Sequence, residues 1–376
     1  MPSPALLPHL SAARAQLTQS TPALCLTFGD VPSEYAAARE GAALFDATDR
    51  ESLLVTGADA RDFLQRLLAN RVTELAPGQG NRTLLLSATG KVLADLDLAV
   101  IDEQAFELSG AAGTIAPLAQ TLDRYLFSED VTLTDSSAEH TPLELCGPAA
   151  HGILAELCGP AVALPAEQHA SISLVEPVGL TGQIRVTRLA IAGQPGWRLA
   201  CGPDEVGNLW QRLTALGAAP AGFIARESLR VEAGQGLWGT DISDAVYPQE
   251  ACLEDAFSLA KGCYTGQEVV AKIDAHEDLN KRLTLMTCDH DDPVPAGTRL
   301  YRQTAARRSP EGNGESGEPD AWRDLGVVTT WAYSFAFGCG AVLAYVKRGH
   351  QEPGTRFRLG AGPQSVTVEP VAAVPG

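Results

Sequence analysis

The sequence has no long apolar segment, no excess of basic residues and no closely spaced cysteine pair. No uncharged apolar run is long enough to span a bilayer, and residues 1–16 lack a basic stretch followed by an apolar one, as a secretory signal would have. The formal net charge is −18, with 46 acidic and 28 basic residues, which argues against general attraction to nucleic acid or anionic lipid. We therefore expect a cytoplasmic protein with no direct nucleic-acid partner and no membrane partner.

The eight cysteines are far apart in a chain of 376 residues, a pattern that predicts reduced thiols rather than a disulfide framework. The segment 288–292 holds several potential metal ligands. A structural zinc site usually needs paired short spacings in two clusters, so no metal is predicted. Because Cys263 has no cysteine within twenty residues except Cys252, a stably bound iron–sulfur cluster is disfavoured. A cluster held transiently with another chain stays open.

The composition is that of a globular protein with two or three domains. The chain is 45% hydrophobic and 20% charged, which suffices for a packed core. Residues 1–20 are rich in Pro and Ala and predict a mobile arm or a short first helix, within an N-terminal arm at 1–34. Residues 35–280 predict an α+β core, and residues 281–376 predict a C-terminal antiparallel β-barrel.

The core is predicted to contain two α+β units of ferredoxin-like order, β-α-β-β-α-β. The first, about 35–140, has predicted strands at 53–55, 83–88, 92–101, 105–108 and 131–134 and helices at 58–70 and 115–127. The second, about 141–280, has predicted strands at 143–145, 183–189 and 197–200 and helices at 149–157, 205–216 and 224–233. Barrel strands are predicted at 282–287, 325–331, 339–346 and 355–359. Inside the barrel, residues 303–320 have almost no apolar side chain and predict a disordered insertion.

Residues Gly234–Gly239 match the G-x-G-x-x-G pattern of dinucleotide-binding proteins, with Asp241 nearby. That fingerprint requires a strand before the glycines and a helix after them. Here a predicted helix precedes the glycines and a Pro-containing loop follows them. Nucleotide binding is therefore disfavoured.

The strongest functional signal is the segment Lys261-Gly262-Cys263-Tyr264-Thr265-Gly266-Gln267-Glu268. It places one thiol between two glycines and beside one of only five lysines in the chain. Glycine lets the backbone adopt positive φ and approach a ligand closely, and a nearby ammonium raises the thiolate fraction of a cysteine. We predict a loop that presents Cys263 as a reactive thiol tuned by Lys261. A small buried cysteine in a tight turn is the alternative.

This octapeptide resembles the signature of the YgfZ family, folate-binding relatives of the glycine-cleavage T-protein (aminomethyltransferase) that support iron–sulfur proteins. The resemblance covers about residues 35–360. Further segments agree with the family in the same order: Leu44–Asp46, Phe63–Asn70, Gly90–Leu96, Ala225–Gly234 and Ala344–Arg348. It implies a T-protein-like core followed by the barrel, and tetrahydrofolate or a related reduced folate as cofactor.

The resemblance also implies folate-binding residues. Asp95 falls on the functional aspartate of T-protein, although the first residue of that acidic pair is Ala94 here, and Arg226 falls on the arginine of its A-R-D segment. A pterin edge suits a carboxylate, and a glutamate tail suits Arg or Lys. The implied contacts are Asp95, Trp197, Arg198, Arg226 and Glu232, the last from an E-A-G segment that closes the pocket wall in T-protein. The alternatives are a solvated hairpin aspartate and a helix-face arginine in a surface ion pair.

Two residues depart from the T-protein pattern. Arg198 stands where T-protein has a pterin-binding carboxylate, and Arg82 stands where it has a tyrosine. Both changes add positive charge and remove acceptors, which puts aminomethyl transfer as in T-protein in doubt. In exchange the chain has the Cys263 loop, which T-protein lacks.

Three functions stay open, with Cys263, Lys261 and Asp95 as candidate catalytic residues. The first is a folate-binding protein that supports assembly or maintenance of iron–sulfur proteins and, through them, tRNA modification. In that case Cys263 is the functional thiol, the glycines shape its loop, and Gln267 and Glu268 bond the backbone or a substrate. The second is a folate-dependent one-carbon transferase or demethylase, and the third is an adaptor whose loop only docks a partner. The expected partners are folate and iron–sulfur proteins or their assembly factors.

Overall fold

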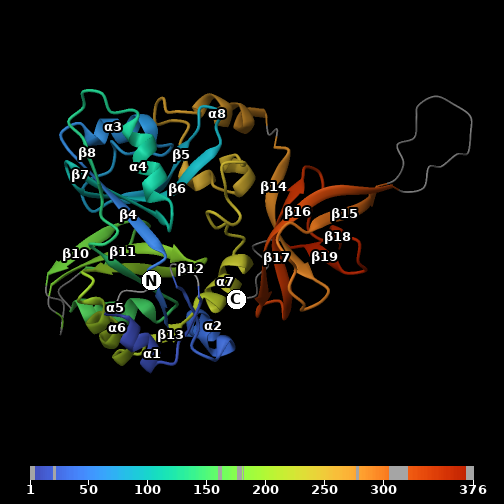
Figure 1. Ribbon diagram of the computed structural model, residues 1–376, viewed down its shortest axis with the longest axis horizontal. Helices are drawn as coiled ribbons and strands as arrows, with labels where there is room; N and C mark the ends of the chain where they lie inside the picture. The colour runs from blue at the N-terminus through green and yellow to red at the C-terminus, as the bar shows by residue number, and fades with distance from the viewer. Residues whose placement is uncertain are drawn as a thin grey trace, which may run out of the picture.

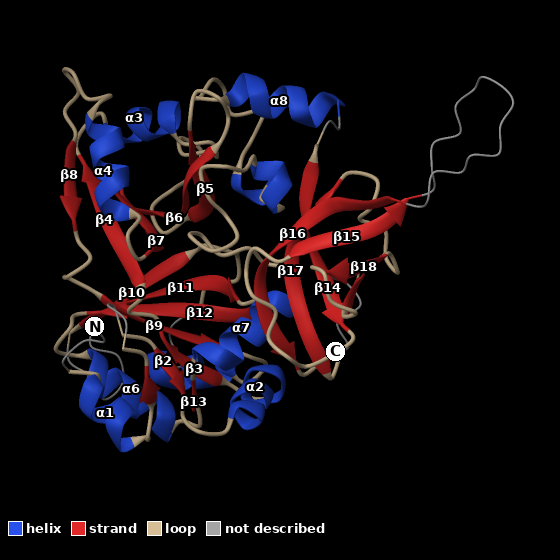
Figure 2. Ribbon diagram, turned by 45° about the vertical axis from the view of Figure 1, so that its right-hand side comes forward, coloured by secondary structure: helices blue, strands red, loops and turns tan. Residues whose placement is uncertain are grey.

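The computed structural model describes residues 5–19, 23–159, 163–175, 180, 182–276, 279–304 and 321–369. Two antiparallel-rich sheets lie one above the other, and a β-barrel stands beside them (Figure 1). Helices cover the outer faces of both sheets, so the inner faces are directed toward each other (Figure 2). The predicted class, α+β followed by a C-terminal antiparallel barrel, is confirmed.

The first sheet has the strand order β5-β6-β7-β4-β8. Its elements are β4 (Arg50–Thr56), α3 (Ala60–Leu67), β5 (Gly80–Leu86), β6 (Val92–Asp102), β7 (Ala105–Ala111), α4 (Ile115–Asp123) and β8 (Thr132–Asp135). The order β6-β7-β4-β8 is that of a ferredoxin-like sheet, and β5 extends its edge. The apolar face of α3 buries Phe63, Leu64 and Leu67 against this sheet, as the helical spacing predicts.

The second sheet has the order β10-β11-β12-β9-β3-β13. Its strands are β3 (Ala43–Asp46), β9 (Thr141–Cys146), β10 (Ser171–Val175), β11 (Gln183–Ile191), β12 (Gln194–Cys201) and β13 (Ala219–Ala221), and its later helices are α5 (Ala150–Cys158), α6 (Val206–Ala215) and α7 (Phe223–Glu232). Strand β3 lies within the range predicted for the first unit, yet it pairs with β9 and β13 of the second. The second sheet therefore includes one strand from the range predicted for the first unit, which a division at residue 140 does not place there.

The N-terminal segment is packed against the second sheet. It contains α1 (Leu7–Ala12), β1 (Gln16–Leu17), β2 (Cys25–Thr27) and α2 (Val31–Glu40). Leu6 and Leu10 are fully buried in the same core as Leu209 and Leu213 of α6. Of the two predicted alternatives, the described residues form the short first helix.

The barrel closes in the order β14-β17-β16-β15-β18-β19, with every pairing antiparallel. Its strands are β14 (Lys281–Cys288), β15 (Arg299–Thr304), β16 (Ala321–Ser334), β17 (Cys339–Lys347), β18 (Arg356–Leu359) and β19 (Ser365–Val368). Gln303 and Thr304, predicted to begin the insertion, are instead the end of β15. The rest of that prediction, residues 305–320, lies outside the described residues.

The segment between α7 and the barrel packs against both the first sheet and the barrel. It contains two short 3₁₀ helices, η1 (Pro248–Ala251) and η2 (Glu254–Ala256), and then α8 (Gln267–His276). Tyr264, Leu84 of β5 and Leu343 of β17 share one apolar cluster. Among the described residues, no helix is both long and apolar enough to cross a membrane.

Candidate functional site

A cavity of about 210 Å³, the central cavity, lies between the inner faces of the two sheets. Strand β6 contributes Asp95 and Asp97, which share one face because side chains alternate along a strand. Strands β9 and β12 contribute Glu144 and Arg198, and the loop after α7, residues 235–238, forms another wall. The segment that matches a dinucleotide fingerprint is thus a cavity wall preceded by a helix.

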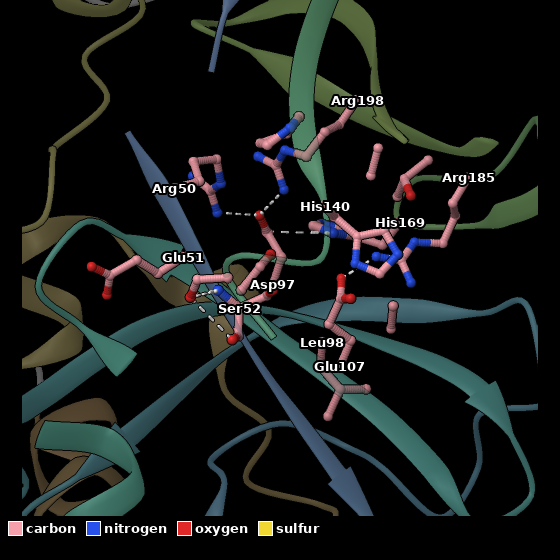
Figure 3. A pocket seen from close by; sticks show the side chains of 16 residues that line it. Arg50, Glu51, Ser52, Asp97, Leu98, Glu107, His140, His169, Arg185 and Arg198 are labelled. Carbon is pink, nitrogen blue, oxygen red and sulfur yellow. Dashed lines mark hydrogen bonds and ion pairs between the residues drawn. The ribbon is translucent and has the colours of Figure 1, made fainter. Parts of the chain in front are cut away.

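Buried ion pairs hold the floor of this cavity together. Asp97 Oδ2 accepts hydrogen bonds from Arg50 Nη2 and Arg198 Nη1, both at 2.8 Å (Figure 3). Glu144 Oε1 accepts from Arg198 Nη2 at 2.9 Å, and Glu144 Oε2 lies 3.1 Å from Arg226 Nη2. Residues from both sheets therefore make one continuous network of charges.

The guanidinium groups keep both carboxylates ionised. Burial opposes ionisation of Asp97, but Arg198, Arg50 and His169 outweigh it and hold the pKa of Asp97 well below its usual range. Burial likewise opposes ionisation of Glu144, but Arg226, Arg198 and Arg50 outweigh it and lower the pKa of Glu144 to about 2. Each carboxylate depends on the arginines around it.

Asp95, the predicted catalytic and folate-binding carboxylate, lines the cavity but already has a partner. Arg82 binds it through two hydrogen bonds, Nε to Oδ1 at 2.9 Å and Nη2 to Oδ2 at 2.6 Å. This bidentate geometry is the strong form of an arginine–carboxylate contact. Asp95 is therefore neither the solvated hairpin residue of the alternative nor a free acceptor.

Three of the predicted folate residues, Asp95, Arg198 and Arg226, line the central cavity together. Arg226 is not in a surface ion pair, since its partners Glu144 and Asp49 are both at least three-quarters buried. Trp197 and Glu232 do not line this cavity.

Trp197 points away from the central cavity because it lies next to Arg198 on strand β12. Its ring is 3% exposed, belongs to the core under α5, and is covered by the guanidinium of Arg188 at 4.1 Å. Trp197 therefore packs in the core and does not line the central cavity, and its folate contact stays a prediction.

Glu232 joins α7 to its neighbours. Its carboxylate accepts hydrogen bonds from Tyr35 Oη at 2.7 Å, Ser334 Oγ at 2.6 Å and the N–H of Ala336 at 3.0 Å. It ties α7 to α2 and to the barrel, and the loop that follows it forms the cavity wall. The contacts of Glu232 are structural, and its folate contact also stays a prediction.

Sequence reasoning missed Arg50, Asp97, Glu144 and His169. Asp97 could have been found, because it repeats the position of Asp95 two residues along the same strand. Arg50, Glu144 and His169 come from separate strands and a loop, and no spacing in the sequence connects them.

The predicted functional loop, residues 261–268, leads into α8 and has the backbone that its glycines suggest. Gly262 and Gly266 have φ values of 100° and 81°. A Cβ on Gly266 would lie 2.4 Å from the carbonyl oxygen of Ser87 and 3.0 Å from the Cα of Gly90. The loop thus packs closely against the turn that joins β5 to β6, and Gly266 is required there.

Lys261 anchors the loop to the end of α3. It is 8% exposed, and its Nζ donates to the carbonyl of Gln65 at 2.6 Å and to that of Leu68. Gln65 Nε2 donates in return to the carbonyl of Lys261 at 2.8 Å. Burial lowers the pKa of Lys261 to about 8. The contacts are those of a structural anchor, and tuning of Cys263 by Lys261 stays a prediction.

The contacts of Tyr264, Gln267 and Glu268 are structural. Tyr264 is buried, and burial raises its pKa to about 12. Gln267 Nε2 donates to the carbonyl of Leu259 at 3.4 Å, and Glu268 pairs with Lys272 at 2.7 Å. Gln267 thus bonds the backbone just before the loop, whereas Glu268 belongs to the exposed face of α8.

Cys263 is the exposed thiol of the protein. All eight cysteines are described and free, and the other seven are buried or half-buried. Burial raises the pKa of each of these seven, to about 12 for Cys146 and Cys288. Cys263 does not line the central cavity. The predicted catalytic residues Asp95 and Cys263 therefore belong to two separate places.

Metal ligands do not gather in the described part of the chain, where no group of three or more His, Cys, Asp or Glu side chains could hold an ion. The segment 288–292 shows why. Cys288 is 5% exposed inside the barrel, while Asp289 bonds Ser365 at its surface.

Comparison with known proteins agrees with this architecture. The aminomethyltransferase of Herpetosiphon aurantiacus is 30% identical over 323 residues, 86% of this chain and 83% of that protein. The aminomethyltransferase of Thermosynechococcus vestitus is 32% identical over 245 residues, 64% of each chain. A crystal structure of glycine cleavage system aminomethyltransferase T from Bartonella henselae has a TM-score of 0.80 at 23% identity, over 97% of this chain and 96% of that one, which confirms the T-protein-like fold. The GCVT N-terminal domain matches residues 23–261, and the chain belongs to that family.

Proposed function

We propose that this protein binds tetrahydrofolate or a related reduced folate in the central cavity. The proposal also assigns it a role in assembly or maintenance of iron–sulfur proteins through the Cys263 loop, as the resemblance to the YgfZ family implies. Its action would be cytoplasmic, and its effect on tRNA modification would be indirect, through enzymes that carry clusters. The observation that carries the proposal is the separation of an exposed thiol from an aminomethyltransferase-type cavity.

The residues of the central cavity fit a reduced folate. The cavity, about 210 Å³, is smaller than the roughly 300–1,000 Å³ typical of drug-sized ligands, so it would enclose only part of a folate molecule. Asp95 would hold the amide-and-amine edge of the pterin once it exchanges Arg82 for the ligand. Arg226 is the candidate for the glutamate tail, although Glu144 and Asp49 compete for its guanidinium. Because both contacts have competitors, we expect micromolar affinity rather than tighter binding.

An exposed thiol outside the folate cavity suits contact with another protein. Thiolates are the usual ligands of iron–sulfur clusters, and a single accessible cysteine can share a cluster only with a second chain. Iron–sulfur proteins or their assembly factors are therefore the proposed partners. Folate in the central cavity and a partner at Cys263 could be bound at the same time.

The test is complementation of a strain that lacks this gene. Cluster-dependent tRNA thiomethylation would be measured with the wild-type gene, with Cys263→Ser, and with Cys339→Ser as the matched cysteine control. Loss of thiomethylation with Cys263→Ser alone supports the proposal. Full complementation by Cys263→Ser makes the loop architectural and favours a docking adaptor instead.

A folate-dependent one-carbon transferase or demethylase is the second candidate, because the similar proteins are named aminomethyltransferases. Asp95 would then be the catalytic group. Its pairing with Arg82, and Arg198 in place of a carboxylate, weigh against it. Turnover of tetrahydrofolate with a methylamine donor, lost in Asp95→Asn, would establish this candidate. Cluster-enzyme defects without any turnover would leave the first.

A further inference from the structure

Behind the central cavity lies a second cavity of about 50 Å³, the rear cavity. Its walls come from β4, β6 and β7 of the first sheet and from β11 and β12 of the second. The lining side chains include Ser52, Asp97, Glu107, Ser109, His140, His169, Arg185, Thr187 and Arg198 (Figure 3). The Arg50–Asp97–Arg198 contacts and His169 form the shared wall, since these residues line both cavities.

Several polar groups that line the rear cavity make no hydrogen bond to the described residues. Among these residues, the Nδ1 of His140 and the Nε of Arg50 are buried without a hydrogen bond, and the Nδ1 of His169 makes none but lies 3.7 Å from Asp97 Oδ1. The hydroxyl groups of Ser109 and Thr187 line the same space and also make none. Buried polar groups are normally satisfied by protein, water or a ligand. The walls of this cavity therefore present unused hydrogen-bonding capacity.

Guanidinium N–H groups are the main unused charged donors. Arg185 contacts Glu107 through Nη2 alone, and its other N–H groups make no hydrogen bond to the described residues. Glu51 also lines the cavity, but its Oε2 accepts the N–H of Ile115 at 3.1 Å and its carboxylate lies on the opposite side from Arg185 (Figure 3). Three arginines and two carboxylates, Asp97 and Glu107, remain facing the space. Carboxylates are the natural partners of guanidinium groups in such a setting.

The volume limits the size of the ligand. A cavity needs about 10–15 Å³ for each water molecule that it holds. The rear cavity, about 50 Å³, therefore has room for roughly three to five non-hydrogen atoms. Formate, acetate and glycine fall in that range, whereas a pterin ring does not.

We propose that the rear cavity is a binding site for a small carboxylate of formate to glycine size, held by Arg185 and the open groups of His140, Ser109 and Thr187. The binding itself does not depend on the proposed function. Its role as a co-ligand beside reduced folate does, because the two ligands would share the Arg50–Asp97–Arg198 wall.

The test is a titration of the whole protein with sodium formate, acetate and glycine at constant ionic strength, with chloride as the reference anion. Binding would be followed by calorimetry and by the line width of ¹³C-labelled formate. A ligand of this size reaches about millimolar affinity at best. We expect saturable binding of at least one probe at millimolar concentration. Because the expected affinity is weak, the titration extends to about 100 mM. If none of the three probes binds more strongly than chloride in that range, the proposal is wrong.

Two variants locate the site. The double variant Arg185→Leu/Glu107→Leu removes both members of one ion pair from the rear cavity, so neither charge is left unpaired. It should weaken binding at least tenfold. Ser109→Leu should fill the cavity and do the same. The control, Arg71→Leu/Glu74→Leu, removes an exposed ion pair and should change nothing. Equal binding by folded Arg185→Leu/Glu107→Leu would overturn the assignment. Tetrahydrofolate is titrated separately, so a failure of folate binding is distinguished from a failure of this site.

Discussion

The central cavity and the Cys263 loop differ in whether their reactive side chains already have partners. In the cavity every predicted polar residue is engaged, Asp95 by Arg82 and Arg198 by Asp97 and Glu144. In the loop, Lys261 and Gln267 bond the backbone while the thiol of Cys263 is exposed. A ligand that binds in the cavity must compete with existing ion pairs, whereas a partner that binds the loop can contact the exposed sulfur of Cys263 directly. The first arrangement favours selective binding and the second favours contact with another macromolecule.

The largest expected effect comes from breaking the cavity network. Glu144→Ala leaves Arg198 and Arg226 buried with one partner fewer, and removing one member of a buried ion pair typically costs about 3–5 kcal/mol of stability. Urea unfolding measures this loss. Glu268→Ala, which removes the exposed pair with Lys272, is the matched control and should give no measurable change. A Glu144→Ala protein as stable as wild type would show that the network is not a structural unit.

Acid should weaken the same network. The pKa of Glu144 is about 2 in the folded protein, below its ordinary value of 4.5. Its ionisation therefore stabilises the fold above pH 4.5, and that contribution is lost as the pH falls from 4.5 toward 2. Unfolding midpoints at several pH values, in wild type and Glu144→Gln, measure the effect. The difference between the two proteins should shrink over that range, and a constant difference would contradict the charge assignment.

The thiol side of the comparison is tested by alkylation. Iodoacetamide at neutral pH should label Cys263 at least tenfold faster than the other seven cysteines, because they are less accessible and burial raises their pKa. Peptide mass spectrometry after timed quenching gives the rates. Cys263→Ser should keep the melting temperature within about two degrees. Slower labelling of Cys263 than of the half-buried Cys252 or Cys339 would show a packed thiol.

The pairing of Asp95 with Arg82 should limit folate affinity. Arg82→Tyr removes the competing guanidinium, so tetrahydrofolate should bind several-fold more tightly, whereas Asp95→Asn should bind it more weakly. Calorimetric titration measures both. Arg71→Leu serves as a control for loss of one arginine outside the cavity. Tighter binding by Asp95→Asn than by Arg82→Tyr would place the pterin away from Asp95.

The smallest expected effect concerns Lys261. Lys261→Met leaves the carbonyls of Gln65 and Leu68 without their donor, so the melting temperature should fall by a few degrees. If the ammonium also tunes the thiol, the same variant should alkylate Cys263 more slowly at neutral pH. An unchanged alkylation rate together with a lower melting temperature would leave Lys261 purely structural.

Local patterns in the sequence predicted the elements well but not their partners. The helical spacing of Phe63, Leu64 and Leu67 and the short strands after residue 281 are local signals, and both are found in the structure. The place of β3 between β9 and β13 is a long-range pairing, which strand propensity does not encode.

The candidate site was predictable only where a single segment carried it. The glycines and the thiol of the loop 261–268 lie within eight consecutive residues, so the sequence alone shows them together. The cavity network depends on Arg50, Glu144 and Arg198 meeting across two sheets. Trp197 lies outside the central cavity because side chains at neighbouring positions of a strand point to opposite faces. Arg198 lines the cavity, so Trp197 does not.

We propose that reduced folate and the reactive thiol occupy separate places in the protein. The most direct measurement is the alkylation rate of Cys263 with and without saturating tetrahydrofolate, with calorimetry of the same sample establishing that the ligand is bound. We expect the rate to change less than about twofold, since Cys263 does not line the central cavity. Strong protection of Cys263 by bound folate would contradict this proposal and would place the thiol in the folate site.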